Sequence, residues 1–231
     1  MKATRLLYLY FSTDPNPLKV VAALEEMELT YQIKSVNLLR GEQHSPEFRH
    51  LNPNGKVPVL IDGPIKIFDS SAILIYLSEK TGKLGGIGTQ YAEILSWLMF
   101  VASGVGPFLG QAIHFRHFSA EDSPYARNRY IYEANRHCDI LEERLQHNSF
   151  LAGDTFSIAD IAAWPWMRLM AFALGDDTTR ARPHIERYIE TVEARPAIER
   201  SLAVKEAYEI DHEIDDAARA FLFPHINNLA Q

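Results

Sequence analysis

The order of strands and helices at the start of the chain constrains its fold more than any other feature. Residues 5–11 are rich in Leu and Tyr and predict a strand, and turn-forming residues follow at 12–16. Asn16 suits the N-cap and Pro17 the first position of a helix whose apolar residues recur at helical spacing. Residues 31–36 predict a second strand, so the two strands should lie parallel in a βαβ unit.

A short helix and a hairpin are predicted next. Residues 45–48 have the sequence of a helix cap and first turn. Residues 57–61 predict a strand with Pro58 near its start, and a turn leads from it to a last strand at residues 65–68. These two strands should pair as an antiparallel hairpin.

One more helix closes this half of the chain. Asp69 and Ser70 are candidates for its N-cap, and Gly82 can end it in a left-handed conformation. The resulting order, βαβ-α-ββα, is that of a thioredoxin-like α/β domain.

The remainder of the chain predicts helices alone. Glycine-rich residues 84–88 are interpreted as a linker between a first domain, residues 1–83, and a second domain, residues 89–231. Five segments beyond the linker have apolar stripes and helix breakers at their ends, and they cover residues 91–105, 124–146, 158–173, 183–194 and 196–208. The second domain is therefore expected to be an all-α helical domain.

Charge and metal-ligand content argue against several classes of function. The formal net charge is -7 and Lys and Arg are scattered, which disfavours a nucleic-acid partner. Cys138 is the only cysteine, so neither an intrachain disulfide nor a cysteine-based zinc site can form. His114 and His117 lack a third ligand, so no metal is expected. The apolar run near the start is too short to cross a membrane, and we expect a cytoplasmic protein without a membrane partner.

Several motifs together resemble those of cytosolic glutathione transferases. The segment 153–161 resembles the C-terminal folding signature of that family, and its Ser157 to Asp160 forms a capping-box-like pattern with a structural role. Residues 14–16 and 106–111 look most like the bacterial nu class and its fungal prion-regulator relatives. The motifs similar to the family's glutathione site are GEQ at 41–43, SPEF at 45–48, NPNGKVP at 52–58 and DSSAI at 69–73.

The resemblance implies that glutathione is bound by the first domain. Glutathione has two carboxylates, an ammonium, a peptide backbone and a thiol, and each needs a partner. If the bond between Val57 and Pro58 is cis, as the resemblance implies, the peptide groups of Val57 can pair with the cysteinyl backbone. The alternative is an ordinary trans proline on an edge strand.

Polar residues in three motifs suit the charged ends of glutathione. Asp69 and Ser70 precede a helix whose first N–H groups suit the γ-glutamyl carboxylate, and the Asp69 carboxylate can accept from the ammonium. Plain helix capping is the alternative and is compatible with binding. Gln43 and Lys56 suit the glycyl carboxylate and backbone amides, or else are solvated loop side chains.

The thiol must be ionised to react, and Asn16 lies where a thiolate could be stabilised. Its amide, with the Thr13 or Ser12 hydroxyl and the helix N-terminus, could donate to the sulfur, although simple capping is the alternative. Two residues depart from the nu pattern, because Asp14 replaces a threonine and Pro17 a glycine. A carboxylate beside the sulfur would raise the pKa of the thiol.

The resemblance assigns further residues to the second domain. Arg129 matches an arginine that reaches the glutathione carboxylates in nu-type proteins, with a surface charge as the alternative. Phe108, Phe115 and Phe118 are candidates for the apolar wall of a second-substrate pocket, or else belong to the core.

The leading hypothesis is an enzyme that activates glutathione. It would conjugate glutathione to a small electrophile, or reduce disulfides or peroxides with glutathione or its disulfide bound. The alternative is a non-catalytic glutathione-binding regulatory protein, which Asp14 favours. The resemblance also implies a symmetric homodimer.

Overall fold

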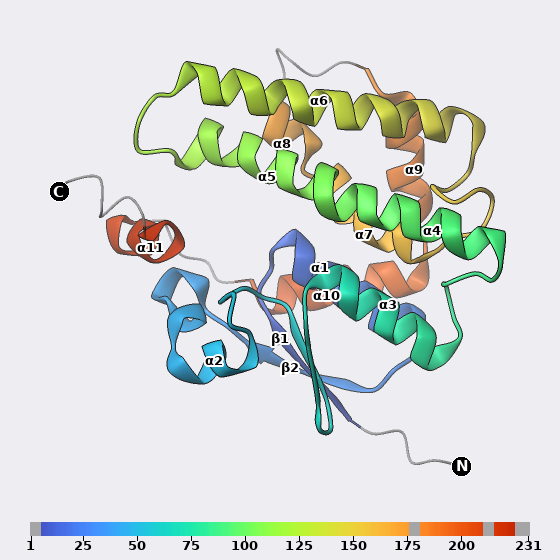
Figure 1. Cartoon of the computed structure of the whole chain (residues 1–231), viewed down its shortest axis with the longest axis horizontal. Coiled ribbons are helices and arrows are strands. Elements are labelled where there is room, and N and C mark those ends of the chain that lie inside the picture. Colours follow the sequence, from blue (N-terminus) through green and yellow to red (C-terminus); the bar gives the residue numbers. More distant parts are fainter. Residues whose placement is uncertain (1–5, 176–180, 210–214, 225–231) are drawn as a thin grey trace. The chain divides into compact units, whose positions relative to one another are not determined.

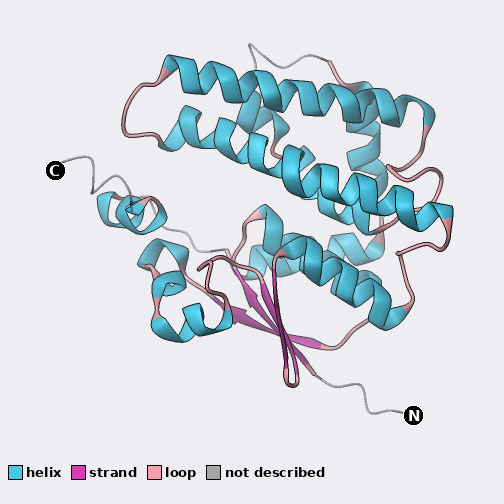
Figure 2. Cartoon of the chain, in the orientation of Figure 1, coloured by secondary structure: helices cyan, strands magenta, loops and turns pink. Residues whose placement is uncertain are grey.

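The computed structural model describes residues 6–175, 181–209 and 215–224. The chain divides into two compact units, residues 1–74 together with 200–231, and residues 75–199. Figure 2 shows that the first unit combines strands and helices, whereas the described part of the second is helical. The α/β and all-α fold classes are confirmed, while the predicted domain boundaries stay predictions.

A four-stranded sheet forms the centre of the first unit, and its strands are β1 (Leu7–Phe11), β2 (Tyr31–Ser35), β3 (Val59–Asp62) and β4 (Ile65–Phe68). The strand order is β2-β1-β3-β4, and β1 and β2 are labelled in Figure 1. The pairing of β1 with β2 is parallel, as the βαβ pattern predicts, and β3 pairs antiparallel with both β1 and β4. The apolar side chains of β1 at Leu7, Leu9 and Phe11 are buried, which fixes the face that this central strand turns to the core.

The first helix, α1 (Pro15–Glu26), begins earlier than predicted. Its N-cap is Asp14, and Asn16 lies in the first turn, so the assignment of Asn16 as N-cap is wrong. Asp14 has an extended backbone with a ψ of 162°, as expected for a residue that precedes a proline. Pro17 is tolerated in the first turn because the N–H groups there have no partner within the helix.

The remaining helices of this half follow the sequence signals closely. In α2 (Pro46–Leu51) the Ser45 side chain accepts a hydrogen bond from the backbone N–H of Phe48. Helix α3 (Ser70–Thr81) ends at Gly82, which has a φ of 69° as a C-terminal glycine should. The predicted polar stretch before α2 contains two short 3₁₀ turns, η1 (Leu38–Arg40) and η2 (Glu42–His44).

A long interrupted helix runs through the second unit from Thr89 to Phe118. It consists of α4 (Thr89–Phe100) and α5 (Gly106–Ile113), each followed by a π-helical turn, at Val101–Val105 and His114–Phe118. By length and composition it could cross a membrane, as many core helices could. Here α4 packs on the helix at Ile158–Met167 and α5 packs on the helix at Pro124–His147, both within the same unit.

The other helices lie close to the predicted positions, with one break. The segment predicted as one helix over 158–173 is interrupted between Met167 and Met170. Figure 1 shows α6 (Pro124–His147), α7 (Ile158–Met167), α8 (Met170–Leu174) and α9 (Pro183–Glu193) around α4 and α5. The last of the predicted helices is α10 (Pro196–Ala207).

The predicted capping box of α7 is confirmed. One carboxylate oxygen of Asp160 accepts from the backbone N–H and the hydroxyl of Ser157, at 2.9 and 3.0 Å, and the other accepts from the N–H of Leu151 at 2.8 Å. Asp160 is fully buried, and this burial raises the pKa of its carboxyl to about 6 against the opposing effect of the hydrogen bonds.

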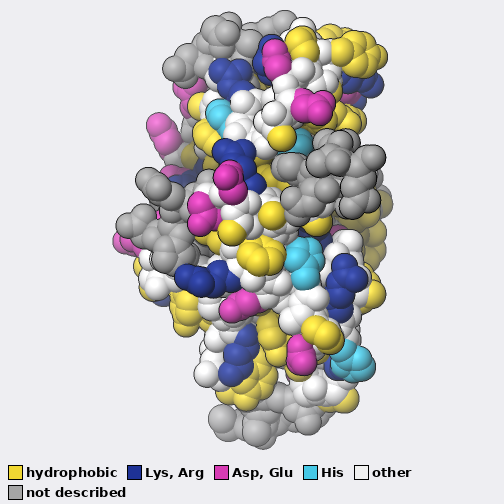
Figure 3. Space-filling view, turned by 90° about the vertical axis from the view of Figure 1, so that its left-hand side faces the viewer, with side chains coloured by type: hydrophobic (Ala, Val, Ile, Leu, Met, Phe, Trp, Pro, Cys, Tyr) yellow, Lys and Arg dark blue, Asp and Glu magenta, His cyan; other side chains and the backbone are white. Residues whose placement is uncertain are grey.

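A further helix, α11 (Asp216–Leu222), was not predicted from the sequence. It belongs to the first unit and packs against η1 (Figure 1). On the face shown in Figure 3, Lys and Arg side chains lie among acidic and hydrophobic ones.

Candidate functional site

Three chain segments that carry predicted site residues meet at one edge of the sheet. Because β1 and β3 are antiparallel with Tyr10 opposite Val59, the end of β1 lies beside the start of β3. The pairing of Val59 with Phe68 brings the end of β4 to the same place. The loop at 12–14, the Val57–Pro58 peptide and the Asp69–Ser70 peptide are therefore neighbours at this edge.

The bond between Val57 and Pro58 is cis, as the resemblance implies, and Val57 lies just outside the strand, which begins at Val59. The preceding loop is held by Asn52, which is 2% exposed. Its side-chain amide donates to the Lys56 carbonyl at 2.6 Å, and its side-chain oxygen accepts from the N–H of Asn54 at 3.0 Å. Sequence reasoning placed Asn52 only at the start of the NPNGKVP motif and assigned it no role of its own.

Asp69 combines capping with a strained backbone. Its carboxylate oxygen Oδ1 accepts from the N–H groups of Ser71 and Ala72, at 2.9 and 3.1 Å, so the capping interpretation is confirmed. Its φ is 74°, in the left-handed region that non-glycine residues seldom occupy. Asp69 is nevertheless exposed, while Ser70 is buried. The start of α3 thus presents a carboxylate and backbone donors at the same edge.

Lys19 is a charged residue of this site that sequence reasoning missed. It is only 2% exposed, within the otherwise apolar run that α1 buries from Leu18 to Leu24. Burial lowers the pKa of its ammonium to about 7, and the nearby negative charge of Asp69 opposes that shift. The sequence does contain a signal for this buried charge, because a lysine interrupts the otherwise apolar face of the predicted helix.

The loop after β1 shows how Asp14 is accommodated. The Ser12 hydroxyl donates to the Asp14 carboxylate at 2.5 Å, so its single proton is already engaged. Thr13 and Asn16 are half-buried on either side of the exposed Asp14. Thr13 and Asn16 remain predicted contacts of a thiolate.

Gln43 and Lys56, both predicted to contact the glycyl carboxylate, differ in their surroundings. Lys56 is exposed, whereas Gln43 is 5% exposed. The Gln43 side-chain amide donates to the carbonyls of Leu38 and Phe221, at 3.2 and 3.3 Å. Its buried oxygen Oε1 has no hydrogen-bond partner among the described residues.

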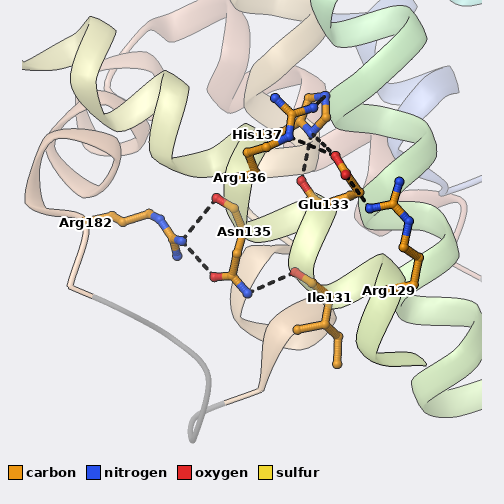
Figure 4. Close-up of polar contacts among 7 residues, drawn as sticks. All are labelled: Arg129, Ile131, Glu133, Asn135, Arg136, His137 and Arg182. Atoms are coloured by element: carbon orange, nitrogen blue, oxygen red, sulfur yellow. Dashed lines mark hydrogen bonds and ion pairs between the residues drawn. The ribbon is translucent and has the colours of Figure 1, made fainter. Parts of the chain in front are cut away.

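In the second unit, Arg129 belongs to a cluster on α6 (Figure 4). Its guanidinium contacts one oxygen of Glu133 at 2.5 Å, and Arg136 contacts the other at 2.9 Å. The hydrogen bonds from Arg136 and Arg129 hold the pKa of the Glu133 carboxyl below its usual value. The Arg129 side chain is 51% exposed, so this pairing leaves much of the guanidinium accessible.

The three predicted pocket phenylalanines are half-buried, and two of them meet a common residue. The Tyr130 ring stacks on Phe115 with centroids 5.3 Å apart and lies 6.4 Å from the ring of Phe108. Phe118 instead contacts the ring of His117 edge-on. Phe108 and Phe115 thus form one aromatic group with Tyr130.

Metal ligands do not gather in the part of the chain that the structure describes, where no group of three His, Cys, Asp or Glu residues could hold a metal ion. His117 instead stacks on Phe172 and hydrogen-bonds its carbonyl at 2.8 Å. Cys138 is completely buried, and burial raises the pKa of its thiol to about 12. Its thiol therefore stays protonated and inaccessible.

Both halves of the chain match a known protein family. The glutathione S-transferase N-terminal domain matches residues 5–79, and the glutathione S-transferase C-terminal domain matches residues 110–196. The disulfide-bond oxidoreductase YfcG of Escherichia coli is 42% identical over 70% of this chain and 79% of its own length. Glutathione S-transferase 1 of Schizosaccharomyces pombe is 41% identical over 66% of this chain and 70% of its own length.

Solved structures with glutathione bound have the same fold. A glutathione transferase of Burkholderia graminis, with two glutathione molecules per subunit, has a TM-score of 0.80 and 36% identity, covering 87% of this chain and 89% of that one. One from Pseudomonas putida, with one glutathione disulfide per subunit, has a TM-score of 0.79 and 33% identity, covering 88% and 94%. The chain thus belongs to the glutathione S-transferase family.

Proposed function

We propose that the chain is an enzyme that binds glutathione at the edge of the sheet in the first unit and activates its thiol. The observation that carries the proposal is the convergence there of the loop after β1, the Val57–Pro58 peptide and the Asp69-capped start of α3. The N–H groups at the start of α3 suit the γ-glutamyl carboxylate, and the Asp69 carboxylate suits the ammonium.

The thiol is stabilised from the start of α1. The positive end of the helix and the side chains of Asn16 and Thr13 lower the pKa of the glutathione thiol by donating to the thiolate. Asp14 opposes this effect, and its hydrogen bond from Ser12 partly satisfies the carboxylate. The Asn16 amide is therefore assigned the largest part of the activation.

Disulfide reduction is the reaction we favour over conjugation. The buried Cys138 supplies no nucleophile, so glutathione has to provide both thiols. The first thiolate attacks the substrate disulfide, forms a mixed disulfide and releases one substrate thiol. A second glutathione thiolate then attacks the mixed disulfide, releases the other substrate thiol and leaves glutathione disulfide. The name of the YfcG relative and the two ligands in the Burkholderia structure support this choice.

Conjugation to a small electrophile, or peroxide reduction, would use the same thiolate. For these substrates we assign the aromatic group around Tyr130, with Phe108 and Phe115, as an apolar surface of the second-substrate pocket. We also propose that Arg129, whose side chain is 51% exposed beside Glu133, is a carboxylate-binding residue of the second unit.

A regulatory protein that binds glutathione without turnover is the second candidate. The position of Asp14 next to the predicted thiolate favours it, because a carboxylate there raises the pKa of a thiol. A homodimer in the cytoplasm is proposed for either candidate on the strength of the family resemblance.

Calorimetric titration with glutathione and glutathione disulfide tests the proposal. Wild-type protein should bind at least one of them, and Asn16→Ala should raise the pKa of the bound thiol and slow the reduction of a small disulfide by about tenfold or more. Asn128→Ala, at an exposed position of α6, is the matched control. Binding without any disulfide reduction or conjugation would favour the regulatory candidate, and failure to bind either ligand would contradict both.

A further inference from the structure

The C-terminal helix α11 docks on the loop that contains Gln43. Asp215 caps it by accepting from the N–H of Ala218 at 2.7 Å. The ring of Phe221 lies so close to Gly41 that a Cβ at this glycine would be 2.5 Å from the ring carbon Cδ1. The φ of Gly41 is 75°, so its backbone conformation also favours glycine. This contact is therefore close and specific.

The C-terminal end of α11 presents a hydrogen-bond acceptor to two polar side chains. The Phe221 carbonyl accepts from the Gln43 amide at 3.3 Å and from the ring nitrogen Nε2 of His44 at 2.9 Å. Carbonyl groups in the last turn of a helix lack partners within the helix and carry partial negative charge. The Phe221 carbonyl at the end of α11 thus accepts from the Gln43 and His44 side chains, as a bound carboxylate could.

This contact uses the donors of Gln43 completely. Its side-chain amide has two N–H groups, and they are directed to the carbonyls of Leu38 and Phe221. The oxygen Oε1 is buried without a partner among the described residues. While α11 is docked, Gln43 therefore has no donor left for a carboxylate.

Gln43 also adjoins the loop that leads to the Val57–Pro58 peptide. A Cβ at Gly55 would lie 3.2 Å from the Gln43 carbonyl oxygen, so the two loops are in contact. Lys56, the other residue assigned to the glycyl carboxylate, follows directly. The end of α11 therefore lies at the glycyl side of the proposed glutathione site.

We propose that α11 is an autoinhibitory, specificity-determining element that competes with the glycyl carboxylate of glutathione for Gln43. The proposal rests on the proposed glutathione site. Binding of glutathione and docking of α11 are then mutually opposed, and by linkage each weakens the other by the same factor. A ligand that lacks the glycyl residue, such as γ-glutamylcysteine, avoids this competition.

The test compares the two ligands in the 231-residue chain. Phe221→Ala removes the ring from Gly41, and Asp215→Ala removes the cap, so both variants weaken docking of α11. We expect each to bind glutathione about three- to tenfold more tightly than wild type, because a larger fraction of molecules is competent to bind. The affinity for γ-glutamylcysteine should stay unchanged. Tyr125→Ala, which truncates a side chain of an 84% exposed residue on α6, is the control and should change neither affinity.

Hydrogen exchange gives a second measurement on the unmodified protein. Saturating glutathione should reduce the protection of the amides in α11, whereas γ-glutamylcysteine should not. Equal affinity of wild type and variants for glutathione, weaker binding by the variants, or parallel changes for both ligands would overturn the competition while leaving the glutathione site intact. If none of the proteins binds either ligand, the proposed function and this inference fail together.

Discussion

The two units of the molecule place their candidate residues in different ways. In the first unit, the site is built at a sheet edge from turns, caps and loop residues whose backbone conformations are individually unusual, such as the left-handed Asp69. In the second, the candidates lie on long helices, where Phe108 and Phe115 are only half-buried members of a regular element. The local geometry of the proposed glutathione site is therefore predictable from the sequence, whereas that of the proposed second-substrate pocket is not.

Asp160→Ala in the second unit should lower the stability of the protein more than any other substitution proposed below. Asp160→Ala removes three hydrogen bonds at the start of the buried helix α7, and we expect the free energy of unfolding to fall by about 3–5 kcal/mol. Urea denaturation measures the change. Asp154→Ala, at an exposed position of the same loop region, should change the stability little. A loss in Asp160→Ala no larger than in this control would refute the structural role of Asp160.

In the first unit, the buried Lys19 allows a test of how stability depends on pH. Because its pKa falls from 10.5 to about 7 on folding, the unfolded chain binds more protons between these pH values. The free energy of unfolding of the wild type should therefore rise as the pH increases from about 7 to 10. The cost of burying the charged Lys19 ammonium is greatest below this pH range. Lys19→Met should raise the free energy of unfolding by about 1–4 kcal/mol at pH 7.

The pH dependence distinguishes this cause from improved packing. The stability difference between Lys19→Met and wild type should shrink as the pH rises from 7 to 10, as measured by urea denaturation at several pH values. Exposed Lys34→Met is the control and should show no such trend. A difference that stays constant with pH would show that burial of the ammonium is not the cause.

A smaller effect is expected at the loop before the Val57–Pro58 peptide. Asn52→Ala removes the buried hydrogen bonds to Lys56 and Asn54, and should cost about 1–2 kcal/mol of stability. Glutathione affinity should fall as well, because the loop that positions Val57 is loosened. Exposed Asn54→Ala, which keeps its backbone N–H to Asn52, is the matched control. Unchanged glutathione affinity in Asn52→Ala would separate this loop from the binding site.

The smallest effect is expected at the aromatic group of the second unit. Phe108→Ala and Phe115→Ala should raise the KM for an aromatic electrophile by up to about tenfold and leave the KM for glutathione unchanged. Phe172→Ala, an exposed aromatic residue on α8, serves as control. If the KM for glutathione rises instead, these residues contribute to the binding of glutathione, and the candidate residues of the two units no longer differ in the substrate that they bind.

Much of the fold could be predicted because its signals are local. The βαβ unit, the hairpin, the Ser45 cap and the Gly82 terminus each depend on a few neighbouring residues. The N-cap of α1 was misplaced by two residues, since both Pro15 and Pro17 suit the first turn of a helix and periodicity does not choose between them.

The unpredicted features depend on contacts between distant residues. The burial of Lys19 depends on the packing of α1 and on Asp69, fifty positions later in the sequence. The engagement of Gln43 by α11 joins residues 178 positions apart. No local pattern predicts the contact between Gln43 and α11, so the sequence alone favoured a solvated or ligand-bound Gln43.

Backbone amide chemical shifts of the 231-residue chain, followed by NMR as glutathione is added, show whether the ligand binds at the sheet edge of the first unit. If the sheet edge of the first unit binds glutathione, the largest shifts should appear at Val57, Ser70 and Ser71 and should saturate with a single Kd. Shifts confined to the second unit, or no shifts at millimolar glutathione, would contradict the proposed site.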